Sequence, residues 1–421
     1  MVYNTNSQKI KISSIALASG TASPYRLNVD GIAGTHFTDI EIEAHDSMYI
    51  FVKVTINPTS QNLPMLVTDS IVFETNGNTQ DVDLLTWGQD AHFIIADTYT
   101  QNLPPYKIVA HEGQTVTWQN DKPYVIYGYA VIDSTARLNI DPGVRIYLHS
   151  NAGIWVYKGG CIKVNGVLDQ PVTFQGDRLE QYYQDVPGQW DRIWLNEGSV
   201  DNEFNYGVIK NAFIGIQAEI LQTSMGNQLL LNNTIIKNSS GIDLLARNYK
   251  ITSENCLFGN SGSYSAALTI GGDYQFKHCT FGNYWAYGVR QTPSLYFNNF
   301  TADDAGTVTA KDLNALFGNC IVYGNNDNEL DFEQSSNAAF VFKFDHTAIK
   351  TTLNTSDVNK YAFCFINTDP AFILPGENNY QLSASSTLIN AAVFNGVTTD
   401  LLGKPRDADP DPGCYEFIPA K

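Results

Sequence analysis

A short signature recurs through the second half of this chain of 421 residues. It consists of an Asn-like position, a small residue, two or three apolar residues, and then Gly or Lys followed by Asn. The copies are Tyr206–Asn211, Asn232–Asn238, Asn255–Asn260 and His278–Asn283, with weaker ones at Asn298–Phe300, Asn319–Asn325 and Asp345–Ile349. Their second residues stand at 207, 233, 256, 279, 299, 320 and 346, so the successive spacings are 26, 23, 23, 20, 21 and 26 residues. Self-similarity of this kind is typical of solenoids.

A variable period in the low twenties predicts a parallel β-helix, in which each coil contains three short strands and three turns. Helical repeats are excluded because the units are rich in Asn, Gly, Thr and aromatic residues and lack a period of 3.6. The predicted class is therefore all-β, with a right-handed parallel β-helix as its main part.

Two columns of side chains should run along this helix. The trailing residues Asn211, Asn238, Asn260, Asn283 and Asn325 predict an asparagine ladder at one turn, each amide bonding the backbone of a neighbouring coil. Cys256, Cys279 and Cys320 should share a small inward position, because a buried free Cys behaves as a small hydrophobic residue. A disulfide bond between cysteines of adjacent coils remains an alternative.

Earlier coils appear as strands with a period of two around the Asp141-Pro142-Gly143 turn. This stretch resembles the opening coils of right-handed β-helix proteins of the pectin-lyase-like superfamily, and Gly188–Leu195 resembles a Gly-x-Trp-x-x-Ile coil of bacterial surface members. The resemblance implies that Trp190 packs in the core. Residues 369–416 resemble the closing module of exported bacterial β-helix proteins, with Gly403-Lys404-Pro405-Arg406 and Gly413-Cys414-Tyr415-Glu416 as its last motifs. A solenoid needs such a cap over its last coil.

The first 90 residues contain six separated strand candidates, at the spacing expected of a β-sandwich. They are Lys9–Ile12, Tyr25–Val29, Asp39–Ile42, Tyr49–Ile56, Asp69–Phe73 and Asp81–Leu84. Their order resembles a bacterial immunoglobulin-like module, through Asn4-Thr5, Phe51–Pro58 and Trp87-Gly88. We therefore expect an immunoglobulin-like β-sandwich at 1–90, a connector at 91–122 and the β-helix with its cap at 123–421.

The charge balance limits the possible partners. The net charge of −18 disfavours nucleic acid and anionic membranes, which bind through Lys and Arg. It also disfavours acidic polysaccharides, unless Ca²⁺ bridges the carboxylates. No apolar run is long enough to span a membrane, and the chain begins without an export signal. From the domain types we nevertheless expect an extracellular or cell-surface protein, such as an outer-membrane lipoprotein with its lipid anchor upstream of this chain.

One stretch concentrates charged and aromatic residues, and it should form a long loop on the flank of the helix. The candidate ligand-binding residues are Arg178, Glu180, Tyr182, Tyr183, Asp185, Asp191 and Arg192. Such side chains can stack on sugar rings and bond their hydroxyls, so we expect non-catalytic binding of a polysaccharide or another surface ligand. The alternatives are a solvated loop on a structural stalk, or a polysaccharide-active enzyme such as a metal-assisted lyase.

No catalytic residue is assigned from the sequence. Polygalacturonase-like hydrolysis is rejected because Asp303-Asp304 precedes Asn367-Thr368-Asp369, the reverse of the family order, and its His-Gly and Arg-Ile-Lys motifs are missing. The alternating carboxylates Asp407, Asp409 and Asp411 form a weak candidate for a Ca²⁺ site. Apart from a possible Ca²⁺ ion, no cofactor is expected.

Overall fold

The fold is seen in a computed structural model, which describes residues 1–56, 65–88, 90–220 and 228–419. The chain divides into two compact units, Met1–Ala91 and His92–Lys421. Strands dominate both units, and the helices among the described residues are three short 3-10 turns, η1 (Gly20–Ala22), η2 (Gln181–Tyr183) and η3 (Pro375–Glu377). The predicted all-β class is confirmed.

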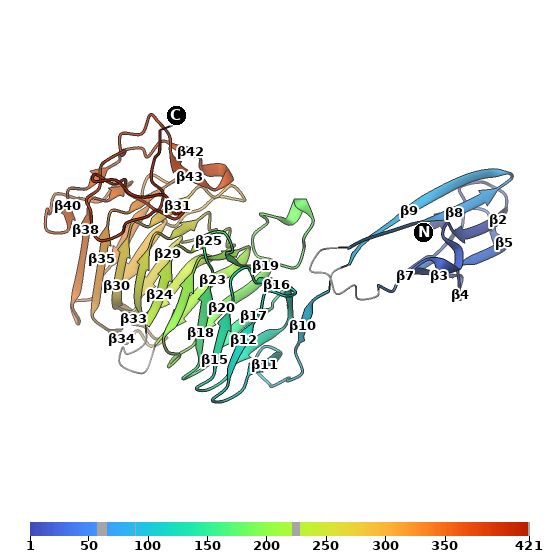
Figure 1. Ribbon diagram of the computed structural model, residues 1–421, viewed down its shortest axis with the longest axis horizontal. Coiled ribbons are helices and arrows are strands. Elements are labelled where there is room, and N and C mark those ends of the chain that lie inside the picture. The colour runs from blue at the N-terminus through green and yellow to red at the C-terminus, as the bar shows by residue number, and fades with distance from the viewer. Residues whose placement is uncertain (57–64, 89, 221–227, 420–421) are drawn as a thin grey trace. The chain divides into compact units, whose positions relative to one another are not determined.

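The second unit is a parallel β-helix whose coils stack along one axis (Figure 1). Its three sheets are parallel, and each strand pairs with the corresponding strand of the next coil. The eleven-stranded sheet contains β10 (His92–Ile95), β13 (Tyr124–Tyr127), β16 (Arg145–Leu148), β19 (Val172–Gly176), β22 (Gly207–Lys210), β25 (Ile235–Lys237), β28 (Leu257–Gly259), β31 (Thr280–Asn283), β36 (Ile321–Gly324), β39 (Ala348–Ile349) and β41 (Phe365–Ile366).

The other two sheets complete each coil. The nine-stranded sheet contains β11 (Tyr106–Ala110), β14 (Tyr129–Ile132), β17 (Gly153–Val156), β20 (Trp190–Leu195), β23 (Ala212–Glu219), β26 (Ile242–Arg247), β29 (Ala266–Thr269), β32 (Leu295–Asn298) and β37 (Leu330–Glu333). The ten-stranded sheet contains β12 (Thr115–Trp118), β15 (Arg137–Ile140), β18 (Cys161–Asn165), β21 (Asn202–Asn205), β24 (Gln228–Asn232), β27 (Lys250–Glu254), β30 (Gly272–Lys277), β35 (Leu313–Gly318), β38 (Phe340–Asp345) and β40 (Tyr361–Ala362).

The first coil lies within the range expected to be a connector. Strands β10, β11 and β12 pair in parallel with β13, β14 and β15. The Pro-rich and Gly-containing segments that interrupt this range fall in its turns, so they separate short strands rather than exclude them. The helix therefore begins before residue 123.

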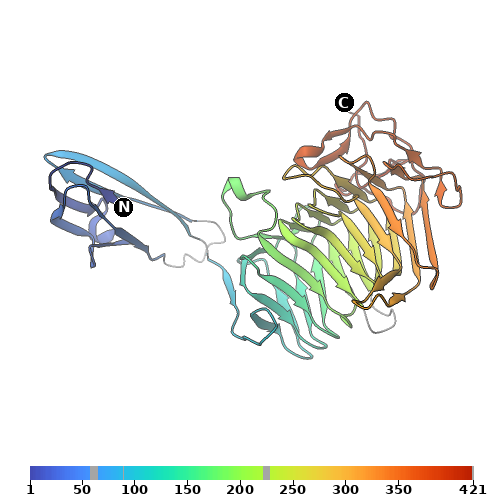
Figure 2. The same ribbon diagram turned by 180° about the vertical axis from the view of Figure 1, so that it is seen from behind.

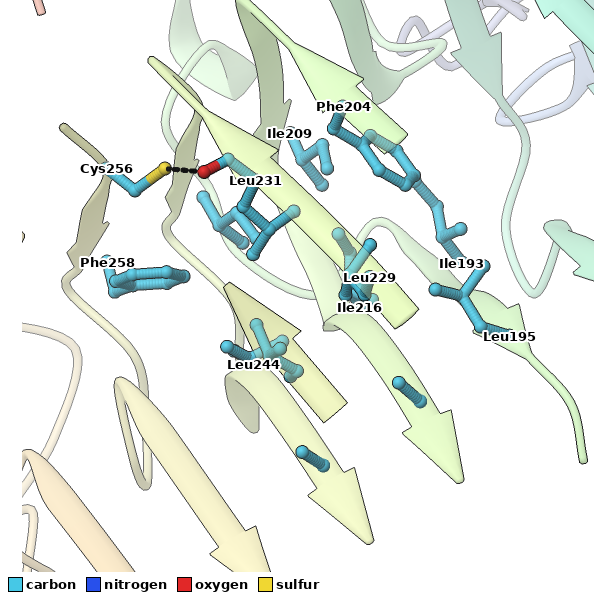
Figure 3. Close-up of a cluster of buried hydrophobic side chains, with 14 of the residues drawn as sticks. Ile193, Leu195, Phe204, Ile209, Ile216, Leu229, Leu231, Leu244, Cys256 and Phe258 are labelled. Carbon is cyan, nitrogen blue, oxygen red and sulfur yellow. Dashed lines mark hydrogen bonds between the residues drawn. The ribbon is translucent and has the colours of Figure 1, made fainter. Parts of the chain in front are cut away.

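The core is made of inward side chains that stack from coil to coil (Figure 3). In the eleven-stranded sheet one column runs through Phe174, Ile209, Ile236, Phe258 and Phe281, in register between neighbouring strands. Trp190 is buried as predicted, and its indole nitrogen donates to the carbonyl oxygen of Lys210 at 2.9 Å. Stacking identical positions buries a continuous apolar column, which is what stabilises a solenoid.

The predicted cysteine column is confirmed. Cys256, Cys279 and Cys320 precede residues that pair in register, and all three are fully buried with free thiols. The same position is occupied by Thr234 and Thr347 in other coils, as their register with the Cys-bearing coils shows. The thiol of Cys256 lies 3.4 Å from the carbonyl oxygen of Leu231 in the preceding coil (Figure 3).

In each of these coils, the residue just before the position of the cysteine column adopts the left-handed backbone conformation. This turn column contains Tyr206, Asn233, Asn255, His278, Asn319, His346 and Phe363, with φ between 46° and 56°. Asn tolerates this conformation better than most residues, which explains its frequency here. In two of the signature copies, the residues used to align them, Asn233 and His346, therefore lie one position before the residue that corresponds to Cys256.

The ladder of trailing asparagines forms only in part. Asn211, Asn238, Asn260 and Asn283 align in register, but Asn283 pairs with Gly324 in the next coil, so Asn325 lies one residue beyond the ladder. Most of the amide bonds reach inserted segments rather than the backbone of the next coil. For example, the amide of Asn260 donates to the side chain of Asn378 in the C-terminal segment, at 2.7 Å.

The prediction that Asn298–Phe300 is a weak copy of the signature is wrong. β32 ends at Asn298, and Phe300 begins an antiparallel hairpin of β33 (Phe300–Ala302) and β34 (Val308–Ala310). The hairpin is inserted within one coil, in the connection from β32 of the nine-stranded sheet to β35 of the ten-stranded sheet, and Asp303 of the sequence pair Asp303-Asp304 lies in its tip. Sequence spacing alone could not separate an inserted hairpin from another coil.

The C-terminal residues do more than close the last coil. After β42 (Phe372–Leu374) and β43 (Asn379–Leu382), the chain packs along the outer side of the eleven-stranded sheet (Figure 2). Tyr380 is buried against Gly259 and Gly282 and donates its hydroxyl to the carbonyl oxygen of Gly282 at 2.9 Å. Arg406 donates to Asn255 and pairs with Glu416, both at 2.9 Å.

The first unit contains two antiparallel sheets around one apolar cluster. One sheet has the order β5 (His36–Ile42), β2 (Ile10–Leu17), β8 (Met65–Thr75), β9 (Asn78–Gly88), and the other has β4 (Ile32–Gly34), β3 (Tyr25–Val29), β7 (Ile50–Val54). β1 (Val2–Tyr3) pairs with β6 (Ser47–Met48). All six predicted strands are present, while Pro58 lies outside the described residues. The immunoglobulin-like relationship stays a prediction.

Candidate functional site

The predicted flank loop, residues 177–189, connects β19 to β20 and contains the short turn η2 (Figure 1, green). Within it, Arg178 pairs with Glu180 at 3.0 Å, and its guanidinium carbon lies 4.0 Å from the ring centroid of Tyr183. The Arg178 guanidinium holds the pKa of the Glu180 carboxyl below its ordinary value. Arg178, Glu180 and Tyr183, three of the predicted ligand-binding residues, therefore lie together in one cluster.

Two amide side chains hold the loop against the helix. Asn211 donates to the carbonyl oxygens of Val186, Gln184 and Tyr183 at 2.7, 3.1 and 3.2 Å. Gln189 donates to the carbonyl oxygens of Tyr183 and Val186 at 2.7 and 2.8 Å. Sequence analysis assigned Asn211 to the ladder and gave Gln189 no role, although both determine the conformation of the loop.

A small cavity of about 180 Å³ lies between the loop and the helix. Its lining combines amide, cationic and aromatic groups from Gln175, Gly176, Arg178, Leu179, Tyr183, Gln184, Gln189, Lys210 and Asn211. Two of its buried oxygens, Oε1 of Gln189 and Oδ1 of Asn211, have no hydrogen-bond partner among the described residues. Burial lowers the pKa of Lys210, whose ammonium donates to the carbonyl oxygen of Gln184 at 3.1 Å.

A second inserted segment reaches the loop. Tyr287, from the connection between β31 and β32, donates its hydroxyl to the carbonyl oxygen of Asp185 at 3.1 Å. The carboxylate of Asp185 in turn accepts a hydrogen bond from Asn238 at 2.9 Å and lies 3.7 Å from Lys237. Tyr182 and Tyr287 are 81% and 59% exposed. We call Tyr182, Tyr183 and Tyr287 the aromatic lip.

Asp191 and Arg192 belong to a different surface, the outer face of the nine-stranded sheet. Both lie on β20 and pair with each other at 2.9 Å. Asp191 also accepts a hydrogen bond from the hydroxyl of Tyr129, and burial together with this carboxylate raises the pKa of Tyr129. The register between β20 and β23 shifts after Arg192, which pairs with Ile214 while Ile193 pairs with Ile216, so the pairing is irregular beside these two residues.

The outer-face network continues through residues that the sequence did not single out. Arg192 donates to Gln217, and Gln217 donates to Glu219 at 3.0 Å. Glu219 is 6% exposed and also accepts from the Trp194 indole at 2.7 Å and from Arg247 at 3.3 Å. Gln217 and Glu219 alternate with core residues along β23, a pattern that becomes informative only after the coil register is known.

The carboxylates proposed for Ca²⁺ are not gathered into one site. Asp407 accepts a hydrogen bond from the backbone of Asp409, and the two oxygens of Asp411 accept from the backbone of Asn390 and Phe417, each at 2.6 Å. Asp411 is almost fully buried, so it shapes the C-terminal segment. Among the residues that the structure describes, no group of three or more His, Cys, Asp or Glu side chains is arranged to hold a metal ion.

Comparison with known protein families agrees with the coil architecture. Residues 110–202 match the family model described as a pectate-lyase like beta helix domain. The matched region begins in β11 and includes the flank loop. Searches of curated proteins and of solved structures gave no significant match. No helix in the described part of the chain is long and apolar enough to cross a bilayer.

Proposed function

We propose that this protein binds an extended glycan without converting it, at the aromatic lip and the adjoining cavity. The observation that carries the proposal is the exposure of Tyr182 and Tyr287 on two inserted segments joined by the bond from Tyr287 to Asp185. Large apolar rings held in place while exposed are suited to stacking, and their hydroxyls add polar contacts. The cavity beside them contains amide oxygens, which can accept hydrogen bonds from sugar hydroxyls, and a cationic group, which can donate to sugar oxygens.

The state of the nearby carboxylates supports binding rather than turnover. A general acid that works near neutral pH needs a raised pKa. Arg178 instead lowers the pKa of Glu180, and Asp185 is engaged by Asn238 and Lys237. These carboxylates are therefore suited to orienting the loop.

An extracellular location is part of the proposal. Only 16% of residues are charged, a composition suited to a β-rich surface that is polar without being ionic. We propose an exported protein held at the cell surface, with a lipid anchor upstream of this chain. Cell fractionation, with an antibody against the β-helix to detect the protein, tests this location. Recovery of the protein in the soluble fraction of the cell interior would contradict export.

The test of binding uses Tyr182→Ala and Tyr287→Ala against a panel of soluble neutral and acidic polysaccharides, with Ca²⁺ and with chelator. Loss of one stacking contact of about 1.4 kcal/mol corresponds to tenfold weaker binding. Tyr99→Ala is the matched control, because Tyr99 is 75% exposed but lies outside the lip. Each mixture is also assayed for new reducing or unsaturated ends.

Tenfold weaker binding in both lip variants, with the control unchanged, is expected. Product formation on any polysaccharide would overturn the proposal in favour of a lyase or hydrolase. Absence of binding across the panel would overturn it in favour of a structural stalk.

A further inference from the structure

The outer face of the eleven-stranded sheet is apolar over the first coils of the helix. Phe93 and Ile95 on β10 are each 57% exposed, whereas Ile94 between them packs in the core. Both faces of β10 are therefore apolar, as is typical of parallel strands that are covered on both sides. In later coils the C-terminal segment supplies this cover, with Tyr380 packed against Gly282. We call the outer face of β10, β13, β16 and β19 the upstream face.

One column of outward side chains connects the upstream face to the cavity beside the aromatic lip. Its members pair in register from one coil to the next, in the order Phe93, Val125, Tyr147 and Gln175. Gln175 also lines the cavity. The upstream face is therefore continuous with the proposed binding site.

A second outward column ends at the flank loop. Ile95 pairs with Tyr127, and the centroid of the Tyr127 ring lies 4.6 Å from that of the His149 ring. Nδ1 of His149 lies 2.7 Å from a carboxylate oxygen of Asp177, the first residue of the flank loop. This hydrogen bond fixes the start of the loop beside the upstream face.

The chemistry of the upstream face suits a neutral sugar chain. Phe93 and Tyr127 provide ring surfaces on which the C–H face of a sugar can pack, and Gln175 and His149 provide polar groups for sugar hydroxyls. An exposed apolar patch bordered by polar groups is typical of an interaction site. The net charge of −18 disfavours an acidic polymer.

The spacing of the coils also suits an extended chain. Neighbouring strands lie about 4.8 Å apart, so the three steps from β10 to β19 span about 14 Å. One step is close to the length of one sugar unit in an extended polysaccharide. A chain that runs across the strands can therefore place one sugar unit over each coil.

We propose that a neutral polysaccharide chain bound at the aromatic lip continues over the upstream face, which binds about three further sugar units. This inference rests on the proposed function, because the lip holds the other end of the same chain. It adds that the ligand is neutral and that it is longer than the lip and its cavity require.

The test is calorimetric titration of the full chain with oligosaccharides of three and six sugar units from cellulose, mannan and xylan, and with hexagalacturonate. In at least one neutral series the hexasaccharide should bind at least tenfold more tightly than the trisaccharide. Hexagalacturonate should bind at least tenfold more weakly than that neutral hexasaccharide.

Phe93→Ala and Ile95→Ala should each reduce the ratio of hexasaccharide to trisaccharide affinity at least fivefold. Phe394→Ala is the matched control, because Phe394 is 62% exposed but lies in the C-terminal segment. Tyr182→Ala should weaken binding of both probes and leave their ratio unchanged, so failure of the lip proposal and failure of this one are distinguishable. Circular dichroism and the melting temperature check that each variant folds, and Ile95→Ala decides if Phe93→Ala does not fold.

Equal affinities of the two lengths in every neutral series would overturn the proposal, and the lip would stand if Tyr182→Ala still weakened binding. Equal effects of Phe93→Ala and Phe394→Ala, or tighter binding of hexagalacturonate, would also overturn it. Sedimentation velocity tests another occupant of the upstream face. A dimer that Phe93→Ala dissociates would assign this face to a second copy of the chain and overturn the proposal.

Discussion

Arg406 and Glu416 form a buried ion pair, with 2.9 Å between Nη1 and Oε2, that fastens the C-terminal segment to the outer side of the β-helix. Arg406 also donates to Asn255, a residue of the turn column more than a hundred positions earlier in the chain. Both charged side chains are almost completely withdrawn from solvent. The pair therefore joins two parts of the molecule that sequence separation keeps far apart.

Removing one partner of this pair should strongly destabilise the protein. Arg406→Leu leaves the Glu416 carboxylate buried without its counter-charge, which costs about 3–5 kcal/mol. Arg178→Leu, which breaks the exposed pair with Glu180, is the matched control and should leave the stability almost unchanged, because solvent screens an exposed pair. Urea denaturation of both variants measures the difference. Similar midpoints would contradict a structural role for the buried pair.

His278 should make the stability depend on pH. Its Nδ1 donates to the carbonyl oxygen of Asp411, and its Nε2 accepts from Asn319, so the folded protein holds the neutral ring. Burial, and secondarily Arg406, lower the pKa of His278 from 6.5 to about 3. Between these values only the unfolded chain is protonated there, so stability falls as pH decreases below 6.5, by about 1.4 kcal/mol per unit.

His278→Asn tests this dependence, because Asn occupies the same turn position in neighbouring coils. The difference in unfolding free energy between the variant and the wild type should change between pH 6.5 and pH 4 and remain constant above pH 7. A constant difference over the whole range would show that His278 does not titrate on unfolding.

Gly282 should not tolerate a side chain. A Cβ atom at this position would lie 2.4 Å from the ring of Tyr380, which packs on the outer side of the helix. Gly282→Ala should therefore cost about 1–3 kcal/mol, as overpacking does. Gly376→Ala is the control, since a Cβ there meets no atom within 4 Å. Equal melting temperatures for the two variants would mean that the C-terminal segment does not pack closely here.

Thiol labelling should separate the cysteines by burial. Cys256, Cys279, Cys320 and Cys414 are fully buried, and Cys161 nearly so, whereas Cys364 is partly exposed. We expect one thiol to react with Ellman's reagent in the native protein and all six after denaturation. Burial raises the pKa of Cys364 to about 11, so this reaction should be slow at neutral pH. Fast reaction, or a first phase that persists in Cys364→Ser, would be inconsistent with this burial pattern.

The recurring signature was enough to predict the β-helix, because in-register stacking requires chemically similar residues at the same place in successive coils. Cys256, Cys279 and Cys320 show this directly. The copy at Asn298–Phe300 failed for the converse reason, since the inserted hairpin β33–β34 imitates the signature without its register. The first coil was assigned to a connector because its three strands are short and lie between turn residues.

Within the candidate site, the sequence determined the local chemistry of the flank loop. Arg178, Glu180, Tyr182 and Tyr183 are neighbours in the chain, so local charge and aromatic content were sufficient to single them out. The tertiary structure alone decided that Tyr287 reaches this loop, that Asp191 and Arg192 face another surface, and that Glu219 accepts hydrogen bonds from Trp194 and Arg247. These relations depend on coil register and insertion length, which place residues side by side that are 25 to 102 positions apart in the chain.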